Sequence, residues 1–242
     1  MKTHKEGTPY KVALFLTRDP GIEASDFSNR WVSVVPPSRP KGLSEYVHNS
    51  AALVEVPIKN APSAPFDAVD EFVFSSADAA GAWFASQEFA REWLEPRVKL
   101  LSAPFKAVSG LAVPVWRQDS AASVDAIKIL TLPVRRAGMS MASFAKHWIV
   151  THAGLALAGP NTRERLQLLT TTPADGRTYP AFERASFDGI GVIKFDSAAS
   201  LNAEFASDHY REVMAPDEAR FNDTTQSRAM MVRETVVLAS DC

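Results

Sequence analysis

The sequence predicts an α+β protein built from two copies of one βαββαβ unit, because a long phrase recurs along the chain. WFASQEFARE at 83–92 is nearly repeated as EFASDHYRE at 204–212, with Phe84 matching Phe205 at an offset of 121 residues. Upstream, GIEASDFSNRW at 21–31 matches GMSMASFAKHW at 138–148 at an offset of 117. Two matched blocks in one order, with a four-residue gain between them in the second copy, indicate a tandem duplication.

The length supports the same division. A chain of 242 residues that is 46% hydrophobic and 22% charged suits two domains, each able to bury a core. The polar stretch RQDSAAS at 117–123 is typical of a connection between them. We therefore expect a first unit at 1–117, a linker at 118–125 and a second unit at 126–242.

Four strands are predicted in each copy from β-branched and aromatic runs that are bounded by turn residues. In the first copy they are 10–17, 43–56, 68–74 and 108–116, and in the second 126–134, 165–172, 185–195 and 229–238.

Two helices are predicted in each copy. The first helix carries aromatic residues four apart, Phe27 and Trp31 in one copy and Phe144 and Trp148 in the other. Prolines after residue 35 and the Gly159-Pro160 pair end these helices. The two segments that contain Phe-Ala-Ser, 83–92 and 204–212, are called the FAS segments and are predicted to be the second helices.

The order βαββαβ is that of the ferredoxin-like unit, whose helices cover one face of an antiparallel sheet. The other face needs cover, and two units packed sheet to sheet provide it within one chain. The predicted architecture is thus two ferredoxin-like units with their antiparallel sheets packed face to face.

Composition excludes several classes of partner. A net charge of −2 gives no electrostatic reason to expect nucleic acid or an anionic membrane surface. No apolar run approaches the roughly 18 residues of a membrane span, and the N-terminus lacks a secretory h-region. The only cysteine is Cys242, so no internal disulfide forms. We expect a cytoplasmic protein.

A metal site is not expected. His147 and His152 are five residues apart, which separates them by about 140° on an α-helix. Such a pair cannot converge as ligands four residues apart do.

Three segments of the second copy resemble the EthD family of the dimeric α/β-barrel superfamily: KHWIVTHAGL (146–155), FDGIGVIKFDS (187–197) and FASDHYREVMAPDEARFND (204–223). The first copy keeps FASQEF and EYVHN, but Val35 stands at the place of His152 and Asp-Gly-Ile is absent. The resemblance implies a dimeric α/β-barrel fold and a small hydrophobic or aromatic substrate, often handled without a cofactor. It also favours a lyase, dehydratase or isomerase in catabolism or natural-product assembly.

His152 is the principal catalytic candidate. Phe144, Trp148 and His152 follow one another at four-residue steps, which places the imidazole on the apolar helix face. Neutral imidazole is a suitable general base near pH 7. The alternative is a core histidine that is satisfied by a backbone carbonyl.

Two further residues are assigned to catalysis. Among the acids Asp217, Glu218 and Asp223, any of which could orient the histidine or form a solvated loop, Asp223 is chosen. Tyr179, beside Pro180, is predicted to cap the pocket as a hydrogen-bond donor, the alternative being an exposed loop tyrosine.

The substrate pocket is predicted in the second copy, between its helices and its sheet. Asp188 is included, although it could only shape the strand entry at Gly189. His48 is included as a lining residue of the first copy, its alternative being a packed polar strand face. The other predicted lining residues are Phe144, Trp148, Phe195 and Phe221.

The predicted function is that of a cofactor-independent lyase, dehydratase or isomerase that uses His152 as acid and base. One alternative is oxygenation of an activated aromatic, either cofactor-free or at a haem bound by His209. Another is a non-catalytic small-molecule-binding protein. We expect one working site, in the second copy, with the first copy mainly a scaffold; a homodimer is compatible with this organisation.

Overall fold

The computed structural model describes residues 8–34, 38–52, 56–58, 62–119 and 123–239. The elements of the first half are, in order, β1 (Tyr10–Leu16), α1 (Ala24–Ser33), β2 (Leu43–Ala51), β3 (Ala68–Phe74), α2 (Ala77–Phe84), the π-helical η1 (Phe89–Leu94), α3 (Glu95–Val98), β4 (Lys106–Leu111) and β5 (Val113–Arg117).

The second half repeats this order with a few additions. It contains β6 (Ile127–Leu132), α4 (Met141–Lys146), the π-helical η2 (His147–His152), α5 (Ala153–Leu157), α6 (Thr162–Arg165), β7 (Leu166–Pro173), β8 (Glu183–Arg184), β9 (Gly189–Phe195), α7 (Ala198–Phe205), the π-helical η3 (Tyr210–Met214), α8 (Ala215–Phe221) and β10 (Arg228–Leu238).

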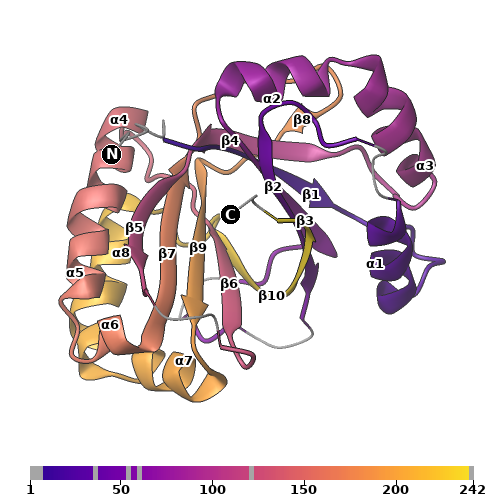
Figure 1. Ribbon diagram of the computed structural model, residues 1–242. Coiled ribbons are helices and arrows are strands. Elements are labelled where there is room, and N and C mark those ends of the chain that lie inside the picture. The colour runs from indigo at the N-terminus through magenta and orange to yellow at the C-terminus, as the bar shows by residue number, and fades with distance from the viewer. Residues whose placement is uncertain (1–7, 35–37, 53–55, 59–61, 120–122, 240–242) are drawn as a thin grey trace, which may run out of the picture.

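The two halves have the same sheet topology. Strands of the first half are ordered β2-β3-β1-β4 and those of the second half β7-β9-β6-β10, all antiparallel to their neighbours. This is the strand order of a ferredoxin-like unit, so the predicted fold class is confirmed. The helices of each half cover the outer face of its own sheet (Figure 1).

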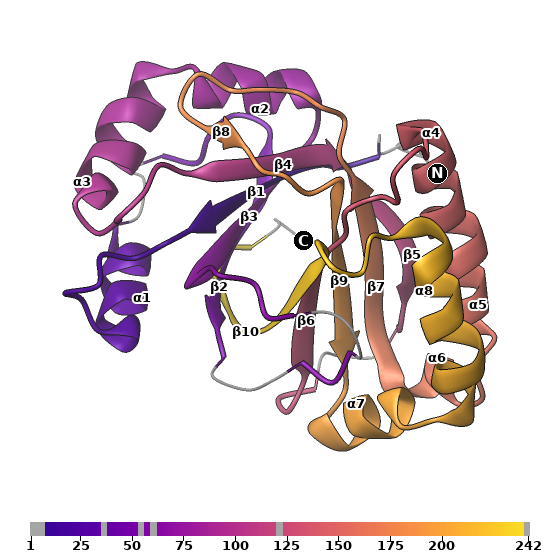
Figure 2. The ribbon, with the colours of Figure 1, turned by 180° about the vertical axis from the view of Figure 1, so that it is seen from behind.

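The last strand of each half closes the structure into a barrel. Residues 228–232 of β10 pair with β6 in their own half, and residues 232–238 pair with β2 of the first half. In the same way β4 pairs with β1, and after a break at Ala112 its continuation β5 pairs with β7. The two sheets thus face each other across an interior and are also joined at both edges (Figure 2). The strand predicted over 108–116 is therefore two strands that serve different halves.

Alternate residues along each strand point into the barrel, and they divide the interior into two zones. One zone is an apolar core that draws Phe15 from β1, Leu130 from β6 and Val192 from β9. The other zone holds ion pairs. Glu71 bridges Lys11 and Lys128, with 2.5 Å between each ammonium nitrogen and a carboxylate oxygen. Because Lys128 belongs to the second half, this network links the two copies.

The FAS segments are junctions between helices, not helix interiors as predicted. α2 ends at Phe84, and the Ser86 hydroxyl oxygen then accepts a hydrogen bond from the backbone N–H of Phe89. In the second half Ser207 caps Tyr210 in the same way. The phrase recurs because serine satisfies the free N–H groups where a second helix begins.

No helix in the described part of the chain is long and apolar enough to cross a membrane.

Replacing the central carboxylate of the barrel is expected to destabilise both halves together. Glu71→Gln removes the negative charge between two buried ammonium groups, which typically costs about 3–5 kcal/mol of the free energy of unfolding. Urea unfolding followed by circular dichroism measures this. Glu92→Gln, on an exposed helix position, is the matched control and should change stability by less than about 0.5 kcal/mol. Equal effects of the two variants would contradict the role of Glu71.

Candidate active site

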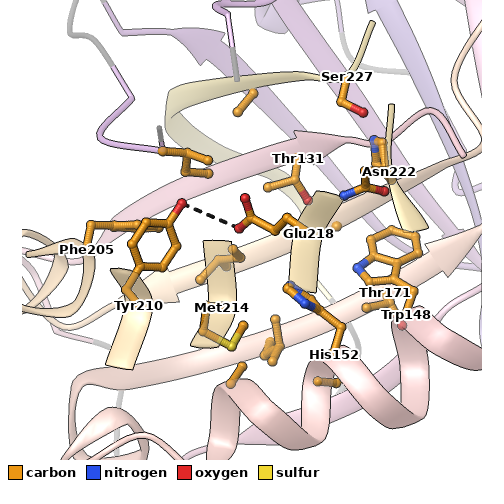
Figure 3. Close-up of a pocket in the computed structure, with 18 of the residues that line it drawn as sticks. Thr131, Trp148, His152, Thr171, Phe205, Tyr210, Met214, Glu218, Asn222 and Ser227 are labelled. Atoms are coloured by element: carbon orange, nitrogen blue, oxygen red, sulfur yellow. Dashed lines mark hydrogen bonds between the residues drawn. The ribbon is translucent and has the colours of Figure 1, made fainter. Parts of the chain in front are cut away.

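A cavity of about 130 Å³ lies between the helices and the outer sheet face of the second half. Its walls come from β6, β7 and β9, from η2 and α5, and from η3 and α8 (Figure 3). Ile58 also lines it, so the first half contributes a residue to the site of the second.

The corresponding space in the first half is filled. Trp93 of η1 packs against Trp31 and Phe72, and His48 Nδ1 forms a 2.7 Å hydrogen bond with Asp70 Oδ1 beside them. The strand registers and the 121-residue offset match these positions to smaller residues in the second half. Trp93, Phe72, Asp70 and His48 correspond to Met214, Ile193, Gly191 and Thr171. The cavity exists in the second half because these four side chains of the first half are replaced there by smaller ones.

Two glycines of β9 make room for the indole of Trp148. A Cβ atom on Gly189 would lie 2.6 Å from Trp148 Cζ3, and one on Gly191 would lie 3.0 Å from Trp148 Cζ2. Both glycines point to the same sheet face because they are two residues apart. The Gly-Ile-Gly sequence therefore allows the indole to lie on the sheet as one wall of the cavity.

The helix that carries the histidines is π-helical, and this corrects the prediction that they diverge. The backbone N–H of Ala153 bonds the carbonyl of Trp148, five residues earlier. Residues five apart consequently lie on one side of the helix. His147 Nε2 is 3.1 Å from both carboxylate oxygens of Asp217, and His152 Nδ1 is 3.0 Å from Asp217 Oδ2.

Asp217 fixes the protonation pattern of His152. The Asp217 side chain is 1% exposed, and its oxygens accept hydrogen bonds from both rings. With the proton of His152 on Nδ1, Nε2 keeps its lone pair and is the basic nitrogen. Burial lowers the pKa of His152 below its ordinary value of 6.5, and the hydrogen bond to Asp217 offsets part of this effect. The ring is therefore neutral at pH 7.

Glu218 faces the same cavity and is neutral at pH 7. Burial raises its pKa to about 8, opposed by a hydrogen bond from Tyr210 and reinforced by the nearby charge of Asp217. The Tyr210 hydroxyl lies 3.4 Å from Glu218 Oε1. A neutral base and a protonated acid thus line one small cavity, His152 from η2 and Glu218 from α8 (Figure 3).

Two buried polar atoms of lining residues have no hydrogen-bond partner in the described part of the chain: Thr171 Oγ1 and Asn222 Oδ1. Unpaired buried polar atoms cost free energy, so they are natural positions for substrate contacts. The amide oxygen of Asn222 accepts a hydrogen bond, and the Thr171 hydroxyl donates or accepts one.

The structure places five of the predicted site residues in or beside the cavity. His152, Trp148, Phe195 and Phe221 line it. Phe144 is fully buried behind Trp148 and Phe221, and it supports this wall without lining the cavity.

Asp223 is not the partner of His152, and Asp217 takes that position instead. The Asp223 side chain forms a local turn, in which Oδ1 accepts from the backbone N–H and the hydroxyl of Thr225, and Oδ2 accepts from the amide of Gln226. All three acids were candidates in the sequence, but only the fold of α8 shows which one reaches the helix with the histidines.

Tyr179 and Asp188, which were predicted as site residues, do not line the cavity either. The Tyr179 ring packs on Phe84 and Phe182 in the core of the first half, with its hydroxyl 3.2 Å from that of Tyr10. Asp188 forms an ion pair with Arg135 at 2.5 Å and accepts the backbone N–H of Arg135. It therefore shapes the entry to β9.

His48 is packed in the first half and does not line the cavity. Its alternative interpretation, a packed polar strand face, therefore holds. Its side chain is 1% exposed and lies against Trp31. The Val35 position, by which the first copy was predicted to lack a counterpart of His152, lies outside the described residues.

The lining residues that were not assigned to the site from the sequence include Thr171, Tyr210, Met214 and Asn222, and also Glu218, which was considered and not chosen. Tyr210 and Met214 carry a sequence signal, because they occupy the offset-121 positions of Phe89 and Trp93 and are more polar or smaller. Thr171 and Asn222 carry no such sequence signal, because they are singled out only by side-chain oxygens that lack a hydrogen-bond partner in the described structure.

Residues 136–225 match the model of the EthD domain, which confirms the resemblance of the second copy. No curated protein sequence matches the chain.

Solved structures share the fold over nearly the whole chain. An anthrone oxidase-like protein has a TM-score of 0.61 at 13% identity and covers 97% of this chain and 96% of its own. A proposed monooxygenase from Lactobacillus acidophilus NCFM has a TM-score of 0.58 at 11% identity, with 97% of each chain covered. A chlorite dismutase variant from Candidatus Nitrospira defluvii has a TM-score of 0.54 at 10% identity, covering 95% and 93%. These similarities show that the mixed α+β fold of this chain is shared with other solved proteins.

Glu218→Gln is expected to stabilise the protein at alkaline pH. The unfolded carboxyl ionises near 4.5, whereas the folded one keeps its proton to about pH 8, so native stability falls between these values. Glutamine does not ionise, and the variant should gain on the order of 1–3 kcal/mol over native protein at pH 8 and little at pH 5.

Urea unfolding at pH 5, 6.5 and 8 measures this gain, with Glu212→Gln on an exposed position as control. A gain that is the same at all three pH values would refute the raised pKa of Glu218.

Proposed function

We propose that the chain is a cofactor-independent acid–base enzyme that acts on a small, neutral, hydrophobic or aromatic molecule. The observation that carries this proposal is the pairing of neutral His152 with protonated Glu218 in one cavity. Catalytic acids and bases need pKa values on either side of the working pH, and these two groups have them.

In the proposed reaction, His152 Nε2 removes a proton from an acidic C–H or O–H group of the substrate. Glu218 donates its proton to a second atom of the same molecule. If that atom is carbon, a double bond has moved and the product is an isomer. If it is the oxygen of a leaving hydroxyl, the products are an alkene and water. Both outcomes conserve all atoms and need no redox partner.

The cavity supports the substrate class. Its volume of about 130 Å³ is near that of an engineered cavity of about 150 Å³ that binds benzene, so a single ring fits. Aromatic and aliphatic side chains form most of the wall, and no ion pair between lining residues crosses the described part of it. Thr171 and Asn222 would orient a hydroxyl or carbonyl group.

Cofactor-free oxygenation of an activated aromatic is the second candidate, favoured by the anthrone oxidase-like and proposed monooxygenase structures. It begins with the same proton abstraction by His152. The carbanion then gives electrons to O₂, a hydroperoxide forms, and loss of water leaves a carbonyl group. Oxygen uptake that matches product formation distinguishes this reaction from isomerisation or dehydration, which consume none.

A haem does not fit the described site. Ligand pockets for larger molecules measure about 300–1,000 Å³, well above this cavity. His209, the haem ligand of the alternative considered from the sequence, is outside the cavity, and its Nε2 is 2.8 Å from the carbonyl oxygen of Leu155.

His152→Ala is expected to slow proton abstraction by on the order of 10²–10⁴ while leaving the fold intact, because the ring lies at a cavity wall. Exchange of substrate C–H for deuterium in D₂O, followed by NMR, measures this step without knowledge of the final product. Suitable probes are single-ring enolisable ketones and resorcinol. The control is His209→Gln, outside the cavity, which should stay within a few-fold of native. Equal exchange rates in native protein and His152→Ala would refute the proposal.

The pH dependence of kcat/KM is expected to be bell-shaped. Activity should fall below about pH 6.5 as His152 gains a proton, with the midpoint lowered by its burial, and above about pH 8 as Glu218 loses one. Glu218→Gln should abolish the alkaline limb. If that limb persists unchanged in the variant, Glu218 is not the acid.

A further inference from the structure

The charged zone inside the barrel borders a second cavity, of about 510 Å³, separate from the acid–base site. The acid–base site lies outside the barrel, between the sheet and the helices that cover it. The second cavity lies inside the barrel. It is lined by residues of both halves, among them Lys11, Ala112, Arg117, Lys128 and Glu234.

The two halves place equivalent lysines in this interior but give them different partners. Lys11 and Lys128 correspond at the 117-residue offset, opposite Gly110 of β4 and Val232 of β10 respectively. Lys128 lies between two carboxylates, 2.5 Å from Glu71 and 2.8 Å from Glu234. Lys11 has an ion pair with Glu71 alone among the described residues.

The register explains the missing carboxylate. Glu234 is two residues beyond Val232 on β10, so it lies on the same, inward face. Two residues beyond Gly110 comes Ala112, the equivalent position beside Lys11. Ala112 lines the cavity. Glu234 of the second half thus pairs with Lys128, whereas Ala112 at the equivalent position of the first half leaves part of the cavity open beside Lys11.

The charge balance of the lining is positive. Four cationic side chains, Lys11, Lys128, Lys194 and Arg117, face three carboxylates, Glu45, Glu71 and Glu234, which leaves one positive charge. Glu71 and Glu234 are each already shared by two lysines. Arg117 adds a cation with no ion pair in the described part of the chain, and Gln118 and Gln167 offer amide donors to the same wall.

We propose that this interior cavity binds a small oxyanion, a carboxylate or phosphate group, beside Lys11 and Ala112 and within reach of Arg117. The anion takes the position that the carboxylate of Glu234 occupies beside Lys128. Its binding balances the excess positive charge of the lining. The proposal is independent of the acid–base chemistry.

The test measures the thermal unfolding of the full chain in rising inorganic phosphate or malonate at constant ionic strength, balanced with chloride. Because a ligand that binds only the folded state raises the unfolding temperature by mass action, a saturable rise is expected with at least one probe. Isothermal calorimetry gives the affinity. Phosphate and malonate together separate the two sources of the oxyanion.

Two variants locate the site. Ala112→Glu supplies the carboxylate within the chain, so it should raise the unfolding temperature without anion and weaken the anion response at least tenfold. Leu111→Glu is the matched control, because the neighbouring residue is 54% exposed on the outer face, and it should keep the native response. Arg117→Gln, at an exposed position, should fold normally and weaken binding at least threefold.

No saturable response of the native protein to either probe would overturn the proposal. An unchanged response in Arg117→Gln would also overturn it, whether or not Ala112→Glu folds.

Discussion

Unpaired strand edges are the constraint on which this architecture depends. A four-stranded ferredoxin-like sheet leaves two rows of backbone N–H and C=O groups without partners, and such edges favour association. Here each half pairs a strand from its C-terminal end with an edge strand of the other half, β10 with β2 and β5 with β7. Closure needs both copies, which accounts for two units in one chain and directs their helices outward.

Outward helices give the chain two equivalent spaces between helix and sheet, and the copies use them differently. In the first half, Trp93 and the His48–Asp70 pair fill this space and contribute packing. In the second half, Met214, Gly191 and Thr171 leave it open. Burial of large aromatic side chains is a major source of stability. The first half therefore contributes stability to the whole barrel, and the second half has less aromatic packing because it contains the cavity.

The open half also contains groups that a purely structural core would avoid. A raised carboxyl pKa at Glu218 means that ionisation is opposed by the fold, and such a group lowers stability at alkaline pH. Asp217, by contrast, is buried with two histidine partners and an arginine 3.7 Å away. Asp217 holds the ring of His152, whereas its neighbour in sequence, Glu218, has a raised pKa, so adjacent residues on α8 have different environments.

The sequence by itself determined the duplication, the βαββαβ order and the half that carries the cavity. The duplication and the element order follow from repeat offsets and hydrophobic periods, which are local properties of the chain. The half that carries the site was inferred from the resemblance to the EthD family and from Val35 at the place of His152. His152, Trp148, Phe195 and Phe221 were predicted from helix spacing and from the same resemblance. Tertiary structure decided which of three nearby acids meets His152, because that depends on where α8 crosses η2. It also decided that His147 and His152 converge, since a π-helical turn is selected by packing and leaves no periodic signal in sequence. The interior ion pairs likewise exist only once strands of both copies enclose a common space. The polar atoms without partners at Thr171 and Asn222 arise only where helices of the second half cover the outer face of its sheet.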